Sequence, residues 1–162
     1  MNRKGFTLVE LLATLVILGV VVGLTIVGVN NIFGNAKKKT EGVFVKTLTD
    51  ALDIYLDSDA KNLSFNSNFT CKVDKSYRKD VEIYESNNNL TYADVIESKY
   101  SPLSITDLKN PANDKECLAS TQVHIYRDQD YVYYYKVDKR NFNCFDDVSD
   151  SLYITNLPSN CY

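Results

Sequence analysis

Residues 1–36 read MNRKGFTLVELLATLVILGVVVGLTIVGVNNIFGNA, and this stretch decides the fold. No charged residue lies between Glu10 and Lys37. The 26 uncharged residues 11–36 would form a helix about 39 Å long, which exceeds the roughly 30 Å hydrocarbon core of a bilayer. The stretch therefore predicts a membrane-spanning helix, and no small-residue cleavage site follows it to suggest removal.

Glu10 is the one acidic residue at the start of this apolar run. An ionised side chain costs about 2.5–3.5 kcal/mol at the centre of a membrane helix, and less near its end. The nearest cations of the same chain are Arg3 and Lys4, and a cation on another copy is the alternative partner. Glu10 is therefore the first candidate functional residue.

The overall composition indicates an anchor followed by one small soluble domain. The chain has 162 residues, with 18 Lys and Arg against 21 Asp and Glu, so its net charge is −3. This mildly acidic balance argues against general electrostatic binding to nucleic acid. Nearly all the long apolar sequence lies in the first 33 residues, and the remainder is rich in polar residues and Tyr.

The stretch RKGFTLVE, residues 3–10, resembles the leader and cleavage motif of type IV prepilins. The resemblance implies that a prepilin peptidase cuts after Gly5 and that Phe6 becomes the N-methylated first residue. It also implies that the Glu10 carboxylate meets the Phe6 amine of a neighbouring subunit during assembly. The domains it implies are a cleaved leader (1–5), a transmembrane and filament-core helix (6–34), its amphipathic half (35–56) and a disulfide-bonded globular pilin head (57–162).

The apolar helix carries one close-packing motif. Gly19 and Gly23 have the GxxxG spacing that lets helices approach closely in lipid. Subunit packing and simple tolerance of glycine in membrane helices remain equal alternatives. Lys37–Lys39 follow the run and are expected to form a solvated collar at the level of the lipid headgroups.

Beyond residue 35 the helix pattern becomes amphipathic. Apolar residues recur at three- and four-residue steps, which predicts one buried face. One long helix is therefore expected from about Thr7 to Tyr55. The expected core positions are Phe44, Leu48, Ala51, Leu52, Tyr55 and Leu56.

The distal part predicts a small antiparallel sheet. A helix is expected over 90–100, with Thr91 as its cap and Asp94 three residues later. Two strands joined by a turn at 128–130 form a natural hairpin. The expected strands are 69–73, 120–127, 131–138 and 152–156. The fold class is α+β, a pilin-like fold in which the second half of the long helix packs on the sheet.

Four cysteines, Cys71, Cys117, Cys144 and Cys161, lie in the distal part without zinc-like spacing. An even number beyond a membrane anchor predicts two disulfides in an oxidising compartment. Their positions about the hairpin favour Cys117–Cys144 with Cys71–Cys161. The resemblance to pilins, which often tie a C-terminal cysteine to a nearby strand, favours Cys144–Cys161 with Cys71–Cys117, and this is the pairing we expect.

The sequence offers no catalytic residue set, so no enzyme activity and no cofactor are expected. His124 is the only histidine, and Asp128 and Asp130 are turn residues. A calcium site is the remaining alternative, because carboxylate oxygens ligate this ion. Its ligands would be Asp146, Asp147 and Asp150.

The expected function is that of a structural subunit of a type IV pilus-like filament. Its expected partners are prepilin peptidase, the membrane, the assembly platform and other pilins in a homo- or hetero-polymer, with no direct nucleic-acid binding. It would begin as a single-pass membrane precursor and end in an extracellular filament at the cell surface. One alternative is a pseudopilin of a type II secretion or competence apparatus. The alternative of another class is a surface protein that binds a ligand and never polymerises.

Overall fold

The computed structural model describes the backbone of residues 7–75, 78–146, 148 and 151–161. Side chains are described for the same residues except 25–28, 30–31, 73–75 and 78–80. The chain divides into two compact units, Met1–Lys39 and Thr40–Tyr162. The leader residues Arg3, Lys4 and Gly5, together with Phe6, lie outside the described residues.

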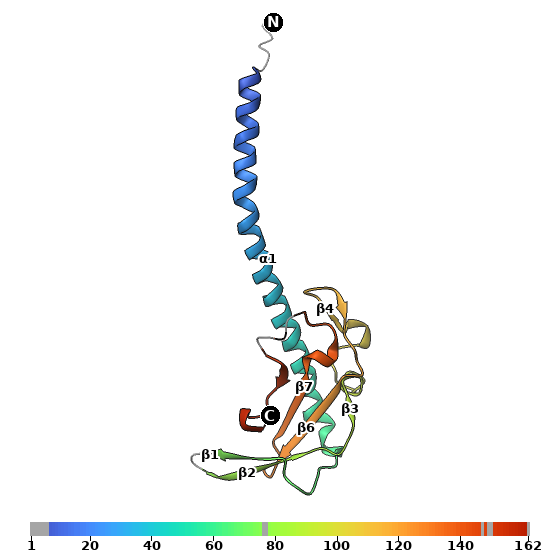
Figure 1. The fold of residues 1–162 in the computed structure, drawn as a ribbon. Coiled ribbons are helices and arrows are strands. Elements are labelled where there is room, and N and C mark those ends of the chain that lie inside the picture. The colour runs from blue at the N-terminus through green and yellow to red at the C-terminus, as the bar shows by residue number, and fades with distance from the viewer. Residues whose placement is uncertain (1–6, 76–77, 147, 149–150, 162) are drawn as a thin grey trace. The chain divides into compact units, whose positions relative to one another are not determined.

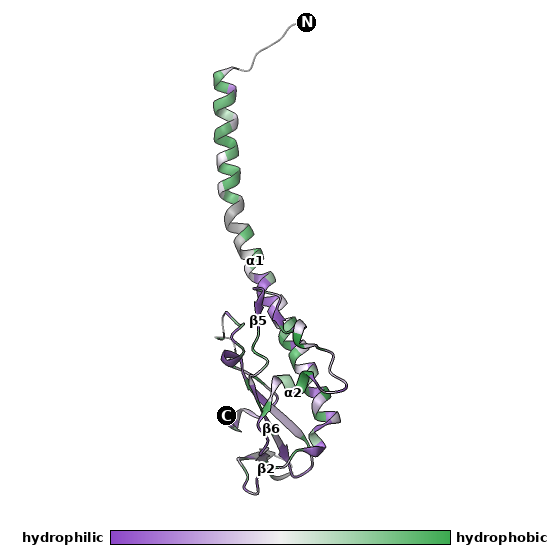
Figure 2. Cartoon of the chain, turned by 90° about the vertical axis from the view of Figure 1, so that its right-hand side faces the viewer, coloured by the Kyte–Doolittle hydropathy of each residue, from purple (hydrophilic) through white to green (hydrophobic). Residues whose placement is uncertain are grey.

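The first unit contains the N-terminal part of helix α1, Leu8–Ser58, which is apolar over most of its length (Figure 2). Large apolar side chains from Leu8 to Leu24 are all more than half exposed. Within the described residues, no helix combines the length and apolarity required of a membrane span.

The second unit is an α+β domain, as expected, which we call the head (residues 40–162). Its antiparallel six-stranded sheet has the order β1-β2-β6-β7-β8, and β3 pairs with β6 (Figure 1). A two-stranded sheet, β4-β5, lies apart from it. The strands are β1 Cys71–Lys75, β2 Arg78–Glu85, β3 Leu90–Thr91, β4 Lys109–Asn110, β5 Lys115–Glu116, β6 Gln122–Asp128, β7 Tyr133–Asp138 and β8 Tyr153–Thr155.

The remaining elements of the head are short helices. Helix α2 spans Tyr92–Ile96. Four 3₁₀ turns cover Ala60–Asn62, Ile105–Asp107, Lys139–Phe142 and Ser159–Cys161.

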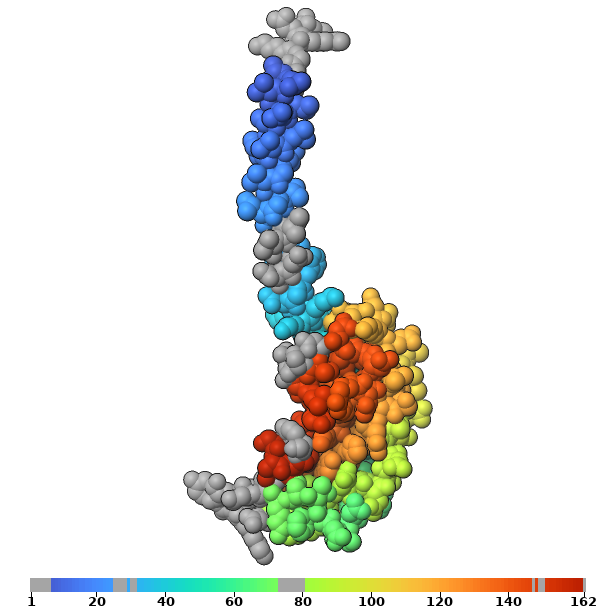
Figure 3. All heavy atoms as spheres, viewed as in Figure 1, coloured from blue at the N-terminus to red at the C-terminus, as the bar shows by residue number. Residues whose placement is uncertain are grey.

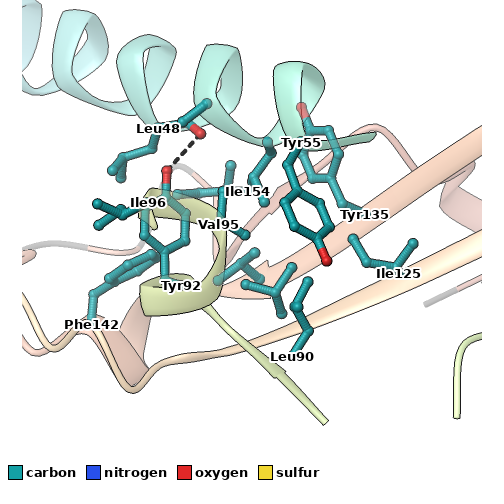
Figure 4. Close-up of a cluster of buried hydrophobic side chains, with 14 of the residues drawn as sticks. Leu48, Tyr55, Leu90, Tyr92, Val95, Ile96, Ile125, Tyr135, Phe142 and Ile154 are labelled. Atoms are coloured by element: carbon teal, nitrogen blue, oxygen red, sulfur yellow. Dashed lines mark hydrogen bonds between the residues drawn. The ribbon is translucent and has the colours of Figure 1, made fainter. Parts of the chain in front are cut away.

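The main core of the head lies between one face of the sheet and the last turns of α1. The six positions predicted on the helix, from Phe44 to Leu56, are all buried. Alternation along the paired strands places Val123 and Ile125 of β6 opposite Val137 and Tyr135 of β7, and all four are buried. Tyr92 of α2 joins the layers, because its hydroxyl donates to the Leu48 carbonyl at 2.7 Å (Figure 4).

The helix expected over 90–100 is shorter than predicted. Leu90 and Thr91 pair with β6 as strand β3, so the helix begins only at Tyr92. The predicted cap is confirmed, since the Thr91 backbone N–H donates to an Asp94 carboxylate oxygen at 2.7 Å. The helix ends at Ile96, with Glu97 as its C-cap.

Strand β2 was not predicted, and the strand expected over 69–73 lies two residues later, at Cys71–Lys75. Among the described side chains of β2, Val81 and Ile83 are the two buried ones, and they lie between charged residues and an Asn-rich loop. This signal is too short to stand out in the sequence. The other three expected strands are present, with β7 and β8 slightly shorter than predicted and β6 shifted to Gln122–Asp128.

Candidate assembly site

The described chain begins at Thr7, one residue after the predicted cleavage point. The Thr7 backbone N–H donates to Glu10 Oε2 at 3.0 Å, and the Thr7 hydroxyl donates to the same oxygen at 2.9 Å. The Glu10 backbone N–H donates to Thr7 Oγ1 at 3.3 Å. Thr7 and Glu10 thus form a reciprocal capping box at the start of α1.

This arrangement gives the Glu10 carboxylate a partner within its own chain. The acidic group also lies at the helix N-terminus, where the macrodipole favours negative charge. Thr7 was not predicted as a functional residue, although the spacing Thr7-x-x-Glu10 is the signature of a capping box. The predicted pairing of Glu10 with the Phe6 amine of a neighbour stays a prediction.

The apolar surface of α1 that follows Glu10, from Leu11 to Leu24, is exposed in the isolated chain. A helix that is apolar on all sides is stable when lipid or other protein surrounds it. Gly19 and Gly23 have open space around them, because a Cβ added at either would meet nothing within 4 Å. They leave room for a partner helix, and their role in packing also stays a prediction.

The disulfide pairing that we expected is wrong. Cys71 pairs with Cys161, and Cys117 pairs with Cys144. The first bond ties the 3₁₀ turn Ser159–Cys161 to β1, which this turn contacts. In Figure 3 the C-terminal segment, in dark red, lies at the surface of the head. This arrangement leaves Cys144 in the main core with Cys117, away from the C-terminal cysteine.

Cys117 reaches Cys144 through backbone pairing. The Cys117 N–H donates to the Leu108 carbonyl at 2.9 Å, and the Leu118 N–H donates to the Phe142 carbonyl at 2.8 Å. The second of these bonds places the segment around Cys117 beside the one around Cys144. The alternative that relied on residue positions about the hairpin is therefore the one found.

The described part of the head shows no cluster of metal-ligating side chains. No group of three or more His, Cys, Asp or Glu residues there could hold a metal ion. Two of the three residues considered for calcium, Asp147 and Asp150, lie outside the described residues. His124 Nδ1 lies 2.9 Å from Glu85 Oε1 on the sheet.

The exposed side of α1 in the head carries a row of acidic residues, Asp50, Asp53 and Asp57. The steps of three and four residues place them on one face. Partial burial, together with the charges of Asp50 and Asp57, raises the pKa of Asp53. Burial and the charges of Asp53 and Asp50 likewise raise the pKa of Tyr135 to about 12. The row is therefore a concentration of negative charge.

The variant Asp53→Asn is expected to stabilise the monomeric protein at neutral pH. Ionised Asp53 opposes folding at pH 7 because its pKa is raised in the folded state, so the asparagine removes this penalty. The gain is about 0.2–0.5 kcal/mol, since solvent screens an exposed charge. It disappears as the pH falls below the unfolded-state value of about 3.9, where aspartate is protonated in both states. Urea unfolding at pH 7 and pH 3 measures both effects, and a loss of stability at pH 7 would contradict the assignment.

Comparison with known families gives one match. Residues 1–26 match the family described as the prokaryotic N-terminal methylation motif. No curated protein and no solved structure matches the chain. Residues 1–26 are thus a class III signal peptide of the kind found on type IV pilins and pseudopilins. The motif supports a type IV pilin-like or pseudopilin precursor.

Proposed function

Because the chain begins with this signal peptide, we propose that it is a structural subunit of a type IV pilus-like filament, with no catalytic step of its own. Prepilin peptidase hydrolyses the Gly5–Phe6 bond, and the new amine of Phe6 is methylated. The subunit is held in the membrane by residues 6–34 until the assembly platform extracts it. The observation that carries the proposal is the methylation motif at residues 1–26.

The exposed apolar helix supports polymerisation. Side chains from Leu8 to Leu24 remain open to solvent in the single chain, and burying them among like helices removes this surface from water. Contacts between helices of neighbouring copies would form the filament core. A folded head with two disulfides would remain outside it, in the oxidising compartment that such bonds require.

The charge at Glu10 supports a defined register in that core. A carboxylate in a helix bundle of low dielectric is costly when it is unpaired and tolerable when it is paired. Its mate is the amine that cleavage exposes on Phe6 of an adjoining subunit. Wrong axial offsets leave both charges without a partner, so the pair penalises them.

The variant Gly5→Val tests the proposal through processing. A branched side chain before the scissile bond is expected to block cleavage, so the protein keeps Met1–Gly5 and forms no filament. Mass spectrometry of the intact protein distinguishes the two lengths. Gly42→Val is the matched control, because Gly42 has open space around it and lies outside the proposed filament-core helix.

The wild-type filament gives the complementary result. Its subunits are expected to begin at a methylated Phe6. Fibres whose subunits retain Met1 or Asn2 would contradict the proposal. A protein that remains at the surface unpolymerised, whatever residue stands at position 5, would instead support a single-pass ligand-binding protein.

The deletion strain separates a pilus from a pseudopilus. A pilus subunit is expected to be required for surface fibres visible by electron microscopy. Loss of protein secretion or of DNA uptake, with fibres unchanged, would assign the chain to a type II secretion or competence apparatus. Both systems use the same processing, so cleavage alone does not separate them.

A further inference from the structure

The head has a surface cavity of about 400 Å³ where the acidic face of α1 meets the turn between β6 and β7. Asp53 and Asp57 line it from the helix, and Tyr131, Val132 and Tyr133 line it from the turn and the start of β7. The side chains of Tyr131 and Val132 are 69% and 48% exposed. The cavity thus combines carboxylates with aromatic and aliphatic surface, and we call it the anionic cavity.

The acidic row beside this cavity is unfavourable for the isolated chain. None of the ion pairs formed by described residues includes Asp50, Asp53 or Asp57. Like charges at steps of three and four residues destabilise a helix, and acidic residues near its C-terminus oppose the macrodipole. The sequence therefore retains negative charge at a cost, which indicates a cationic partner from outside the chain.

The aromatic side of the cavity is held in a fixed, strained conformation. Tyr131 has a left-handed backbone with φ of 63°, a region that non-glycine residues rarely occupy. The buried Asp128 carboxylate fixes the turn by accepting the Asp130 and Val132 backbone N–H groups, both at 2.9 Å. The Arg127 guanidinium lies 4.7 Å from the centre of the Tyr131 ring. The turn is thus braced to present an aromatic ring next to carboxylates.

Carboxylates beside aromatic rings suit an alkylammonium group. The charged head pairs with the carboxylates, and its methylene stem packs on the rings. The chain itself carries a matching element, since Lys37–Lys39 is its only run of three basic residues. All three lysines are exposed.

We propose that the anionic cavity binds the Lys37–Lys39 run of a second copy of this chain. The proposal rests on the proposed function, because it assumes that copies polymerise. The two complementary surfaces consist of different residues, so the contact is heterologous rather than self-complementary. A heterologous contact that does not close into a ring continues as a helical filament. Complementary charge also suppresses wrong registers of the neighbouring copy.

The test expresses two charge-reversed variants in place of the wild-type chain, in the cells that normally assemble the filament. Variant A carries Asp53→Lys and Asp57→Lys, and variant B carries Lys37→Glu and Lys39→Glu. Either variant alone places like charges at the contact. Each is expected to lower the filament mass per cell about tenfold or more, which corresponds to about 1.4 kcal/mol. Immunoblots of sheared fibres measure this mass.

Expression of A and B together provides the decisive measurement. Every A–B contact joins opposite charges in both orders, so co-expression is expected to restore filaments that contain both variants. A contact within one chain could not be restored in this way. Single variants that assemble like wild type, or a mixture that stays as defective as its components, would overturn the proposal.

Two controls separate this proposal from others. Glu97→Lys with Glu116→Lys makes the same change in net charge as variant A, away from the cavity, and is expected to leave filament mass unchanged. An equal loss in this control would overturn the proposal, because net charge alone would then explain the defect. Oxidised disulfides and an unfolding temperature no lower than that of the wild type confirm that the heads of variants A and B fold. If wild-type chains form no filament at all, the proposed function fails. If wild-type filaments form normally and the variants give the same filament mass, only the cavity contact is wrong.

Discussion

Replacing Glu10 by alanine is expected to reduce filament formation about a hundredfold or more while the head stays folded. In the proposed polymer the substitution leaves the Phe6 amine of a neighbour without its anion in a core of low dielectric. Breaking a buried pair by removing one partner costs about 3–5 kcal/mol, and each 1.4 kcal/mol is about tenfold in an equilibrium. Counting fibres by electron microscopy measures assembly, and circular dichroism of the purified protein measures folding.

The glutamine variant separates the two roles that the structure and the proposal give Glu10. Glutamine at this position can still complete a capping box with Thr7. If capping were the main role, Glu10→Gln would assemble normally. We expect it to be as defective as Glu10→Ala, because it carries no charge. Thr7→Ala removes the cap and keeps the carboxylate, so its cost is expected to be only about 1 kcal/mol of helix stability.

The amphipathic pattern of the sequence predicted the residues that α1 contributes to the main core. The predicted helix positions from Phe44 to Leu56 are all buried, since a 3.6-residue period can be read directly from the sequence. The hairpin of β6 and β7 could also be predicted from the sequence, because two long runs of strand-forming residues flank a polar turn. Local periodicity in the sequence was therefore enough to predict the α+β fold class.

Only part of the candidate site could be predicted from the sequence. The capping box of Thr91 and Asp94 was predicted, yet the equivalent pair of Thr7 and Glu10 was not, because the resemblance to prepilins implies a partner for Glu10 on another copy. The anionic cavity was also missed. Its residues Asp53 and Tyr131 are far apart in the chain, and only the packing of α1 beside the β6–β7 turn brings them together.

The sequence left the disulfide pairing open, since four cysteines allow three pairings and two arguments from the sequence favoured different ones. Tertiary contacts decide between them. Cys117 is placed beside Cys144 by the backbone bond from Leu118 to Phe142, and Cys161 is placed by the contact of its 3₁₀ turn with β1. The pairing implied by the resemblance to pilins is wrong because this head places its C-terminal segment against β1.

Removing the Cys71–Cys161 disulfide is expected to have the largest effect on the stability of the head. The bond joins residues 90 apart in sequence, and Cys117–Cys144 joins residues 27 apart. Cross-links that close longer loops restrict the unfolded chain more, which gives about 4–5 kcal/mol for the first and about 3–4 kcal/mol for the second. The double variants Cys71→Ser/Cys161→Ser and Cys117→Ser/Cys144→Ser, unfolded in urea, measure the two costs.

The comparison of the two double variants also tests how far chain entropy alone decides the result. Cys144 is fully buried in the main core, and its serine substitute places a hydroxyl there, whereas Cys161 is only partly buried. Burying a hydroxyl that lacks a partner costs about 1–3 kcal/mol. Alanine in place of serine at Cys144 removes this polar cost, so the Cys117→Ser/Cys144→Ala variant isolates the loop-closure contribution. If this variant is less stable than Cys71→Ser/Cys161→Ser, loop length does not govern the stability of this head, because the shorter loop should cost less.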